Sequence, residues 1–518
     1  MNKDLTAKQN DYARFLPALS GFYATYVGKQ RYDEYVDKSR IPSNFTNGVE
    51  SLNYLNKQEG QFQYQWTLYS AGHAELDVNK HAPKEDMVRN RDRQNSWILG
   101  DSGGFQIGKG VWEGDWKNPN CPKAQKKRDG VLRWMDAYMD YGMVLDIPAW
   151  VARSPKGQEA TGITSYQEAV DGTRINNDYW IANRTGACKF LNVLQGENHE
   201  EADDWYNQMK DYCDPKQYPD NHFNGWAMGG QNMCDVHLIL RRLVHMIHDG
   251  LLEEGIHDVM HFLGTSKLEW AVLLTDIQRA VRKYHNKNFM ITYDCASPFL
   301  ATANGQVYHS IRVEDRGKWS YMMAPGADAL KYAKDTRLFS DAITADGILE
   351  AFEDSPISKH CKINDICFYA EGDKNKVGAI KVKAGDVDLD KNGNPLVDDD
   401  GNPVIRKKDS TSWDSFSYAL QMGHNVWMHI ESTQRANEKY DAGLFPYMLI
   451  NDKDFPGWGV VKFKDVVDEI FSLKDRQKSL DLIDKYSKYW MHVIGTRLNI
   501  GKKTVNASTM FGKLFEEV

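Results

Sequence analysis

Between residues 96 and 300, short apolar segments alternate with segments of helical periodicity. Six such apolar segments begin in turn at Trp97, Met143, Lys189, Phe223, Val259 and Phe289. This alternation is typical of a parallel sheet, because two parallel strands need a crossover connection, usually a helix. Two further segments rich in strand-forming residues, 22–27 and 62–69, precede the six. About eight strands favour a closed (β/α)8 TIM barrel over an open sheet.

Each of the six segments ends in a polar residue or in glycine. These ends are Asp101, Asp146, Gln195, Gly229-Gly230, Gly264 and Asp294. The carboxyl ends of the strands of a TIM barrel meet at one mouth, where the active site lies. Asp101 is followed by two glycines, which allow a sharp turn and the close approach of a ligand. Asp101 also fits the N-cap of the next helix, but five further polar strand ends favour a role at the mouth.

The chain has 518 residues, enough for two or three domains or for one large α/β domain with additions. We expect a catalytic barrel over 1–360, an inserted loop and β-hairpin segment over 361–411, and a helical part over 412–518. The last part would complete the barrel and add a nucleic-acid-binding surface. Within the insertion, the near-repeat of turn residues and β-formers at 392–397 and 400–405 predicts one or two hairpins.

The sequence has no apolar run of about 18 residues, so no transmembrane helix is expected. The first ten residues are polar rather than a secretory signal, and the seven scattered cysteines fit reduced thiols. We therefore expect a cytoplasmic protein without a membrane partner. The net charge is −8, so binding of nucleic acid would need a local basic surface. Candidates are Lys123, Lys126, Lys127 and Arg128 in a loop, and Lys474, Arg476, Lys478, Lys485, Lys488, Arg497, Lys502 and Lys503 near the C-terminus.

The polar groups expected at the mouth suit a purine-like base attached to a sugar. Carboxylates accept hydrogen bonds from N–H groups, an amide both donates and accepts, and backbone N–H groups of glycines donate to a carbonyl. Cleavage of an N-glycosidic bond passes through an oxocarbenium-like transition state. One carboxylate can attack or stabilise the sugar carbon, while another handles the proton of the base.

Several short motifs resemble those of the tRNA-guanine transglycosylase superfamily, in the family's order and at similar spacing. They are Asp-Ser-Gly-Gly-Phe-Gln at 101–106, Gln-Gly at 195–196, Ala-Met-Gly-Gly at 227–230, Phe-Leu-Gly at 262–264, Tyr-Asp-Cys-Ala-Ser at 293–297 and Asn-Gly-Gln at 304–306. The resemblance covers residues 90–310. It implies a base-exchanging pentosyltransferase built on a TIM barrel.

The resemblance assigns roles residue by residue. Asp294 matches the nucleophile that forms a covalent glycosyl-enzyme at C1′, and Asp101 matches the residue that handles the proton of the leaving and incoming bases. The implied base-binding residues are Ser102, Phe105, Asp146, Gln195, Gly229, Gly230, Gln231, Leu263 and Gly264. Among these, Phe105 and Leu263 match the pair that sandwiches the base. Gln231 and Asp235 stand where the family has an apolar residue and a Glu that help to sense the 7-substituent.

Two departures from the family pattern bear on the substrate. The Cys-x-Cys-x-x-Cys zinc motif of the tRNA enzymes is absent, and Gln434 stands where the zinc-binding His would be. No cofactor is expected, although a replacement zinc site could draw on His360, Cys361, Cys367, His424 and His429. The segment 297–303 carries none of the arginines that reach tRNA phosphates in the family.

These departures favour the branch of the superfamily that exchanges guanine in DNA for a 7-deazaguanine such as preQ0, found in phages and bacterial DNA-modification clusters. The expected partners are then DNA, free guanine and the free 7-deazaguanine base, in the cytoplasm of the host if a phage encodes the chain. Such an enzyme must extrude a base or act on single strands. Trp112, Trp116, Trp150 and Trp180 are candidates for stacking on exposed bases or, alternatively, for core packing.

Three other functions remain open at this point. The chain fits a divergent tRNA-guanine transglycosylase acting in a queuosine- or archaeosine-type modification. It also fits a non-catalytic nucleic-acid-binding subunit, although all three carboxylates are retained, and a hydrolytic N-glycosidase that uses water as the acceptor. The incoming base, the sequence context, the strandedness of the substrate and the oligomeric state are not defined by the sequence.

Overall fold

The structure is a computed structural model that describes residues 4–28, 40–80, 86–326, 332, 334–340, 355–366, 385–389, 394–398, 401–405, 415–451 and 459–494. Eight parallel strands form its centre. They are β1 (Arg14–Pro17), β2 (Trp66–Ser70), β3 (Trp97–Asp101), β4 (Tyr141–Met143), β5 (Lys189–Leu194), β6 (Gly225–Met228), β7 (Val259–Phe262) and β8 (Met290–Cys295). The sheet order is β1-β8-β7-β6-β5-β4-β3-β2.

The first and last strands of this order also meet. Just beyond β1, the Leu19 N–H donates to the Leu68 carbonyl of β2 over 2.8 Å, and Ala18 bridges Leu68 in parallel. The sheet therefore curls into a nearly closed barrel, as predicted. Its strands are almost entirely buried; every residue of β2, β6, β7 and β8 is buried.

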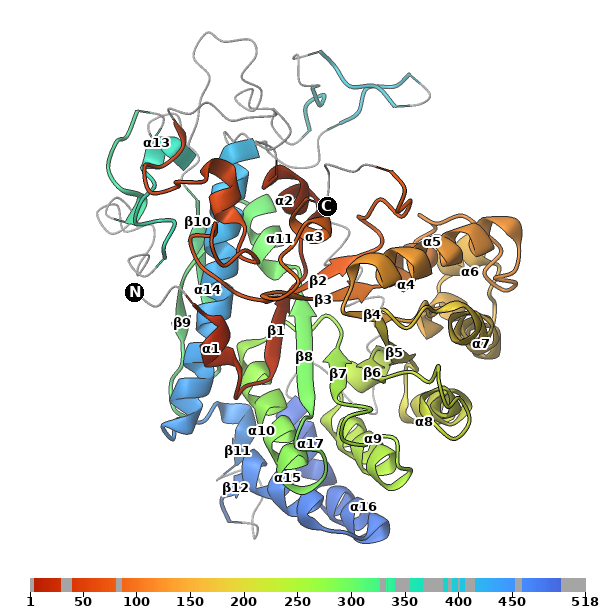
Figure 1. Ribbon diagram of the computed structural model, residues 1–518. Coiled ribbons are helices and arrows are strands. Elements are labelled where there is room, and N and C mark those ends of the chain that lie inside the picture. The colour runs from red at the N-terminus through yellow and green to blue at the C-terminus, as the bar shows by residue number, and fades with distance from the viewer. Residues whose placement is uncertain are drawn as a thin grey trace.

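Helices surround the barrel (Figure 1). The described α-helices up to β8 are α1 (Thr6–Gln9), α2 (Gly21–Tyr26), α3 (Asp86–Arg89), α4 (Gly104–Gly108), α5 (Pro122–Tyr138), α6 (Pro155–Thr161), α7 (Tyr166–Asn183), α8 (His199–Met209), α9 (Val236–His248) and α10 (Leu268–Tyr284). After β8 come α11 (Ser297–Ala303), α13 (Ile363–Ile366), α14 (Ser415–Asp441), α15 (Phe463–Ser472), α16 (Arg476–Lys485) and α17 (Ser487–Ile494). None of the helices in these parts of the chain is long and apolar enough to cross a bilayer.

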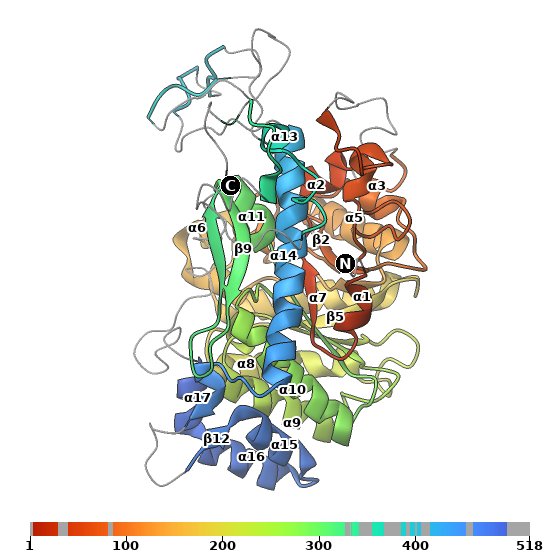
Figure 2. The same ribbon diagram turned by 90° about the vertical axis from the view of Figure 1, so that its left-hand side faces the viewer.

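After α11 the chain forms an antiparallel hairpin of β9 (Gln306–Arg312) and β10 (Ser320–Pro325). The long helix α14 runs along this hairpin (Figure 2) and packs on α10, α11 and β1. A segment more than a hundred residues further on thus covers this side of the barrel. A two-stranded ribbon of β11 (Ile450–Asn451) and β12 (Val461–Lys462) leads to α15, which packs on α10. The described parts of the 361–411 segment contain three antiparallel bridges, Val387 to Ile405, Leu389 to Pro395 and Val397 to Pro403, consistent with the predicted hairpins.

The N-terminal part corrects one prediction. Residues 22–27 were expected to form a strand, but 21–26 form helix α2, and the first strand lies earlier, at Arg14–Pro17. Ser20 caps the helix by accepting a hydrogen bond from the Tyr23 N–H, and the rings of Phe22 and Tyr26 stack one turn apart. These aromatic residues favour a strand when considered alone, but here they stack on one face of a helix that Ser20 caps.

Two more boundaries differ from prediction. Lys123, Lys126, Lys127 and Arg128 were expected in a loop. They lie on helix α5 instead, which begins at Pro122, a residue favoured in a first helical turn. Strand β4 ends at Met143, so Asp146 lies three residues beyond the strand rather than at its end. The intervening residues continue along the barrel, since the Val144 N–H donates to the Leu191 carbonyl of β5.

Candidate active site

Asp101 ends β3 at the carboxyl mouth of the barrel, where the sequence predicted it. Its Oδ2 accepts a hydrogen bond from the Ser70 hydroxyl at 2.5 Å, and its Oδ1 lies 3.4 Å from the Gly103 N–H. The side chain does not cap α4, whose N-cap is Gly103 without a side-chain hydrogen bond. Burial raises the pKa of Asp101 above its ordinary value, against the opposing effect of the Ser70 hydrogen bond. Asp101 can therefore hold a proton more readily than an exposed aspartate.

Gly104 brings the turn after β3 against Asp146. A Cβ atom at this position would lie 2.8 Å from the Asp146 carbonyl oxygen and 2.9 Å from its Oδ1, closer than real Cβ contacts. Only glycine fits this approach. The Asp-Ser-Gly-Gly motif thus positions two carboxylates together, one on each side of the turn.

Asp146 is 6% exposed and is bonded to Gln195 at the end of β5. The Gln195 amide donates from Nε2 to Asp146 Oδ2 over 2.7 Å. Burial raises the pKa of Asp146 to about 7; the Gln195 hydrogen bond opposes this shift and the charge of Asp101 adds to it. The pair offers an acceptor, an amide and a titratable proton together, which are the groups needed to bind the edge of a heterocycle.

The diglycine after β6 closes this side of the mouth. Gly230 has a left-handed φ of 54°, and a Cβ there would lie 2.3 Å from the Gly196 carbonyl oxygen. The Gln231 N–H donates to the same carbonyl over 2.7 Å. The Gly229–Gly230 turn is thereby held directly against Gln195-Gly196.

Gln231 and Asp235 form a polar chain behind that turn. Gln231 Nε2 donates to Asp235 Oδ2 over 3.1 Å, and His199 Nε2 lies 2.7 Å from the same oxygen. Asp235 also caps α9 by accepting from the Leu238 N–H. Burial alone would raise the pKa of Asp235, but the hydrogen bonds from His199, Gln231 and this N–H outweigh burial and lower it. His199 is a contact that the sequence analysis missed.

Asp294 lies within β8, is 8% exposed, and has one oxygen held in place. Its Oδ1 accepts from the Gly264 N–H over 2.8 Å and lies 3.2 Å from His261 Nε2. Its Oδ2 has no hydrogen-bond partner among the residues that the structure describes. One oxygen is thus fixed while the other remains available to a ligand.

His261 is the main functional residue that sequence reasoning missed. It lies inside β7 with no exposed surface, and its Nδ1 lies 2.8 Å from the Thr292 hydroxyl. With the proton on Nε2, the imidazole can donate a hydrogen bond to Asp294 Oδ1 while Nδ1 accepts one from the Thr292 hydroxyl. The signal available in the sequence was a histidine in an apolar strand three residues before the Gly264 turn.

The remaining predicted base-site residues also follow the ends of the strands. Ser102 is buried beside Asp101. Phe105 lies on α4, partly buried, with its ring 6.3 Å from that of Trp150 and with the Lys109 ammonium 5.4 Å from its centre. Leu263 is partly buried in the turn after β7. The two proposed walls of a base site therefore come from opposite sides of the barrel.

The three carboxylates interact electrostatically. The charge of Asp294 contributes to raising the pKa of Asp101, and the charge of Asp101 contributes to raising the pKa of Asp146. Like charges held close in a buried site favour protonation of at least one of them. The mouth thus combines a hydrogen-bonded carboxylate, Asp294, with two carboxyls that tend to hold protons.

Helix α14, which carries three of the polar residues considered for a zinc site, uses them for packing. On α14, Gln434 Nε2 donates to the Leu5 carbonyl and to Gln9 Oε1. His424 lies between the Ser355 hydroxyl and the Tyr308 carbonyl, and His429 lies 3.0 Å from the Tyr321 hydroxyl. In the described part of the chain, no three His, Cys, Asp or Glu side chains are placed to hold a metal ion. Cys367 lies outside the described residues.

The predicted aromatic residues are used within the fold, whereas the predicted basic residues are used there only in part; Lys126, Lys474, Lys478, Lys485 and Lys488 are exposed. Trp112, Trp116, Trp150 and Trp180 are all buried, so they pack in the core rather than stack on bases. On α5, Lys123 pairs with Glu113, and Arg128 is buried over the Tyr179 ring. In the C-terminal set, Arg476 pairs with Asp249, and Arg497, Lys502 and Lys503 lie outside the described residues.

Comparison of the chain with models of protein families and with curated proteins finds no match.

Proposed function

We propose that this protein is a base-exchange transglycosylase that replaces guanine in DNA by a 7-deazaguanine base such as preQ0. The reaction would proceed through a covalent bond between the sugar and Asp294. The observation that carries the proposal is the pairing of two differently held carboxyls: Asp294 with one fixed oxygen, and Asp101 with a pKa raised by burial. Retaining glycosyl transfer needs one group as a nucleophile and another as an acid and base.

In the first half-reaction, Asp294 Oδ2 attacks C1′ of the guanosine as the bond from C1′ to the base breaks. Protonated Asp101 gives its proton to the departing guanine. In the second half-reaction, Asp101 takes a proton from the incoming base, whose ring nitrogen attacks C1′ and displaces Asp294. The hydrogen bonds from His261 and Gly264 to Oδ1 orient the carboxylate and stabilise it as a leaving group.

Asp146, Gln195 and the Gly229–Gly230 turn would bind the edge of the base, between Phe105 and Leu263. Asp146 and Gln195 are already hydrogen-bonded to each other, so this edge is preorganised. Gln231 and Asp235, with His199 behind them, would face the 7-substituent and discriminate among incoming bases.

Two observations favour DNA over tRNA as the substrate. Helix α11 follows the nucleophile and contains no basic residue. Gln434, at the position of the family's zinc ligand, is buried in hydrogen bonds to the N-terminal segment. Both features separate this chain from the tRNA-binding pattern.

The test is an exchange assay with radiolabelled guanine or preQ0, offered with guanine-containing DNA or with unmodified tRNA. We expect label in DNA and none in tRNA. Label in tRNA alone would show a divergent tRNA enzyme. Release of guanine without incorporation would show a hydrolytic N-glycosidase, and no reaction with either would point to a non-catalytic nucleic-acid-binding subunit.

A further inference from the structure

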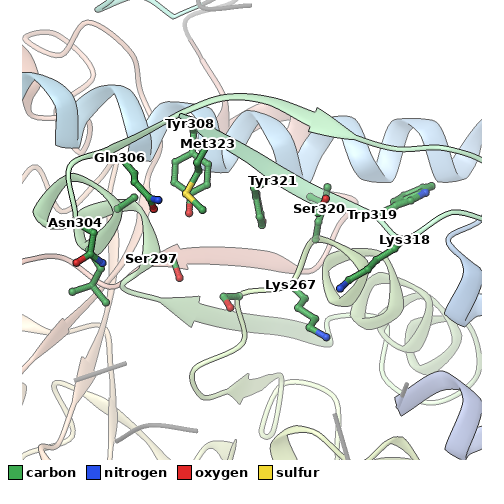
Figure 3. Close-up of a pocket in the computed structure, with 14 residues that line it drawn as sticks. Lys267, Ser297, Asn304, Gln306, Tyr308, Lys318, Trp319, Ser320, Tyr321 and Met323 are labelled. Carbon is green, nitrogen blue, oxygen red and sulfur yellow. The ribbon is translucent and has the colours of Figure 1, made fainter. Parts of the chain in front are cut away.

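A cavity of about 400 Å³ lies under the β9–β10 hairpin (Figure 3). The β9–β10 hairpin forms one wall, and the turn before α10 together with α11 forms the other. Its volume is within the range of about 300–1,000 Å³ typical of sites for small organic ligands. None of the roles assigned above to Asp101, Asp146, Gln195 or Asp294 uses this space.

The cavity is lined by residues that directly follow, in sequence, Asp294 and its hydrogen-bond donor Gly264. On one wall, Ser266 and Lys267 come just after Gly264, whose N–H donates to Asp294. On the other side, Ser297 comes three residues after Asp294 and opens α11. A DNA strand whose sugar is bonded to Asp294 through C1′ can therefore extend from the active site into this cavity.

The walls of the cavity differ in chemistry. Tyr308, Tyr321 and Met323 project from the hairpin toward the turn that carries Lys267 and toward Ser297 at the start of α11 (Figure 3). Lys267 and Lys318 lie at one end, whereas Asn304 and Gln306 lie at the other (Figure 3). Aromatic rings offer a face to a base, amides donate to and accept from its edge, and ammonium groups attract a phosphate.

The charge at this rim is positive. Lys318 is exposed and has no ion pair among the described residues. Of the nearby carboxylates, Glu269 accepts a hydrogen bond from the Trp319 backbone N–H, and Glu314 lies 3.9 Å from Arg312. Because α11 itself carries no cation, the positive charge beside the nucleophile comes from the hairpin and from the loop before α10.

We propose that this cavity binds the nucleotide that adjoins the reacting guanosine in the substrate strand. Its base would lie against the aromatic face of the hairpin, its edge would meet Asn304 and Gln306, and its phosphate would meet Lys318. This inference rests on the proposed function, because it takes Asp294 to attack C1′ of the reacting deoxyguanosine. The β9–β10 hairpin would then provide much of the binding surface for the nucleic acid. Such a site favours a single-stranded or locally opened substrate, whose bases are free to stack.

Binding can be measured without chemistry, by the fluorescence anisotropy of a labelled single-stranded oligonucleotide containing one guanine. Lys318→Glu should weaken binding about tenfold, and Lys318→Ala should reduce the slope of log K against log salt by about 0.7. The matched control is Lys216→Glu, since Lys216 is an exposed lysine on the loop that enters β6, at the opposite end of the barrel. Equal affinities for Lys318→Glu and Lys216→Glu would overturn the proposal.

Crosslinking locates the bound nucleotide. With 5-iodouracil placed on either side of the guanine, irradiation should yield a crosslinked peptide from residues 304–323 for one of the two positions. Crosslinks that avoid this peptide at both positions would overturn the assignment, as would full competition by a free mononucleotide at micromolar concentration. These assays do not depend on base exchange, so the two proposals can fail separately. Crosslinking to this peptide without base exchange would refute the proposed function, whereas base exchange without this crosslink would refute the nucleotide site.

Discussion

The imidazole of His261 lies 3.2 Å from the carboxylate of Asp294, Nε2 to Oδ1, and both side chains are buried between β7 and β8. Thr292, two residues before Asp294 on the same strand, occupies the other ring nitrogen. A histidine fixed in this way orients the carboxylate without itself reaching the mouth. It is a positioning residue for the proposed nucleophile.

Replacing His261 should slow formation of the covalent intermediate. Hydrogen bonds to charged groups contribute about 1.5–3 kcal/mol, so His261→Phe should lower the single-turnover rate by about 10–100-fold. His261→Gln keeps an N–H donor and should recover much of this loss. Rapid-quench measurement at saturating strand concentration checks the prediction, and an unchanged rate for His261→Phe would contradict the positioning role.

Asp101→Asn should remove proton transfer to and from the base while leaving the fold intact. Loss of a general acid costs about 10²–10⁴-fold in rate, so exchange should fall by that factor. With the wild-type protein, the rate of the first half-reaction should decline as the pH rises through the elevated pKa of Asp101, because the proton donor is lost. A rate that does not depend on pH, or an active Asp101→Asn variant, would assign the proton to another group.

Asp146 should make the protein less stable as the pH rises. Its folded-state pKa is raised to about 7 from an ordinary 3.8, so the folded protein retains a proton that the unfolded chain loses between these values. Its contribution to the free energy of unfolding is full below about pH 4 and is lost toward about pH 7, at up to about 1.4 kcal/mol per pH unit. Asp146→Asn should flatten this part of the stability curve measured by urea unfolding.

A matched control for Asp146 is available outside the active site. Asp276 on α10 accepts a hydrogen bond from Tyr440, and burial raises its pKa to about 7 as well. Asp276→Asn should flatten the stability curve in the same direction but leave base exchange unchanged, whereas Asp146→Asn should impair exchange. Equal slopes for the wild type and for Asp146→Asn would show that Asp146 stays ionised in the folded protein.

Gly104→Ala should damage the site through sterics alone. The added methyl would lie 2.8–2.9 Å from two oxygens of Asp146, and such overpacking costs about 1–3 kcal/mol. Exchange should fall together with the stability. Gly130→Ala, in the middle of α5 where the nearest atom would be 3.4 Å away, should instead be neutral or stabilising. If both variants are equally stable by thermal unfolding and equally active, the contact with Asp146 is not required.

The barrel was predictable because the alternation of apolar segments and helical segments is repeated along the chain. Strands β3, β5 and β7 begin at the predicted residues, Trp97, Lys189 and Val259, since each lies in a clear apolar segment that ends in polar residues or glycine. Helix α2 was missed because Phe22–Tyr26 has the aromatic residues of a strand, and only the cap at Ser20 and the packing decide for a helix. Local preference gives way there to tertiary context.

Some residues of the candidate site were predictable from the sequence, and others were not. Asp101, Asp146, Gln195 and Asp294 lie at or just beyond the ends of strands, where a linear pattern indicates them. His261, His199 and the cavity under the hairpin depend on side chains from different elements that meet only in the folded chain. No spacing rule in one sequence pairs His261 with Asp294, because the two residues are thirty-three positions apart and are joined by strand pairing.

The most direct test of the account is to trap the covalent intermediate on the unmutated protein and to identify both partners of the bond. The protein is incubated with guanine-containing DNA and denatured, and the adduct is digested for mass spectrometry, with tRNA in a parallel reaction. We expect a deoxyribosyl adduct on Asp294 with DNA, none with tRNA, and none for Asp294→Asn. An adduct on another residue, or one formed by Asp294→Asn, would contradict the assignment of the nucleophile, and an adduct with tRNA alone would contradict the assignment of the substrate.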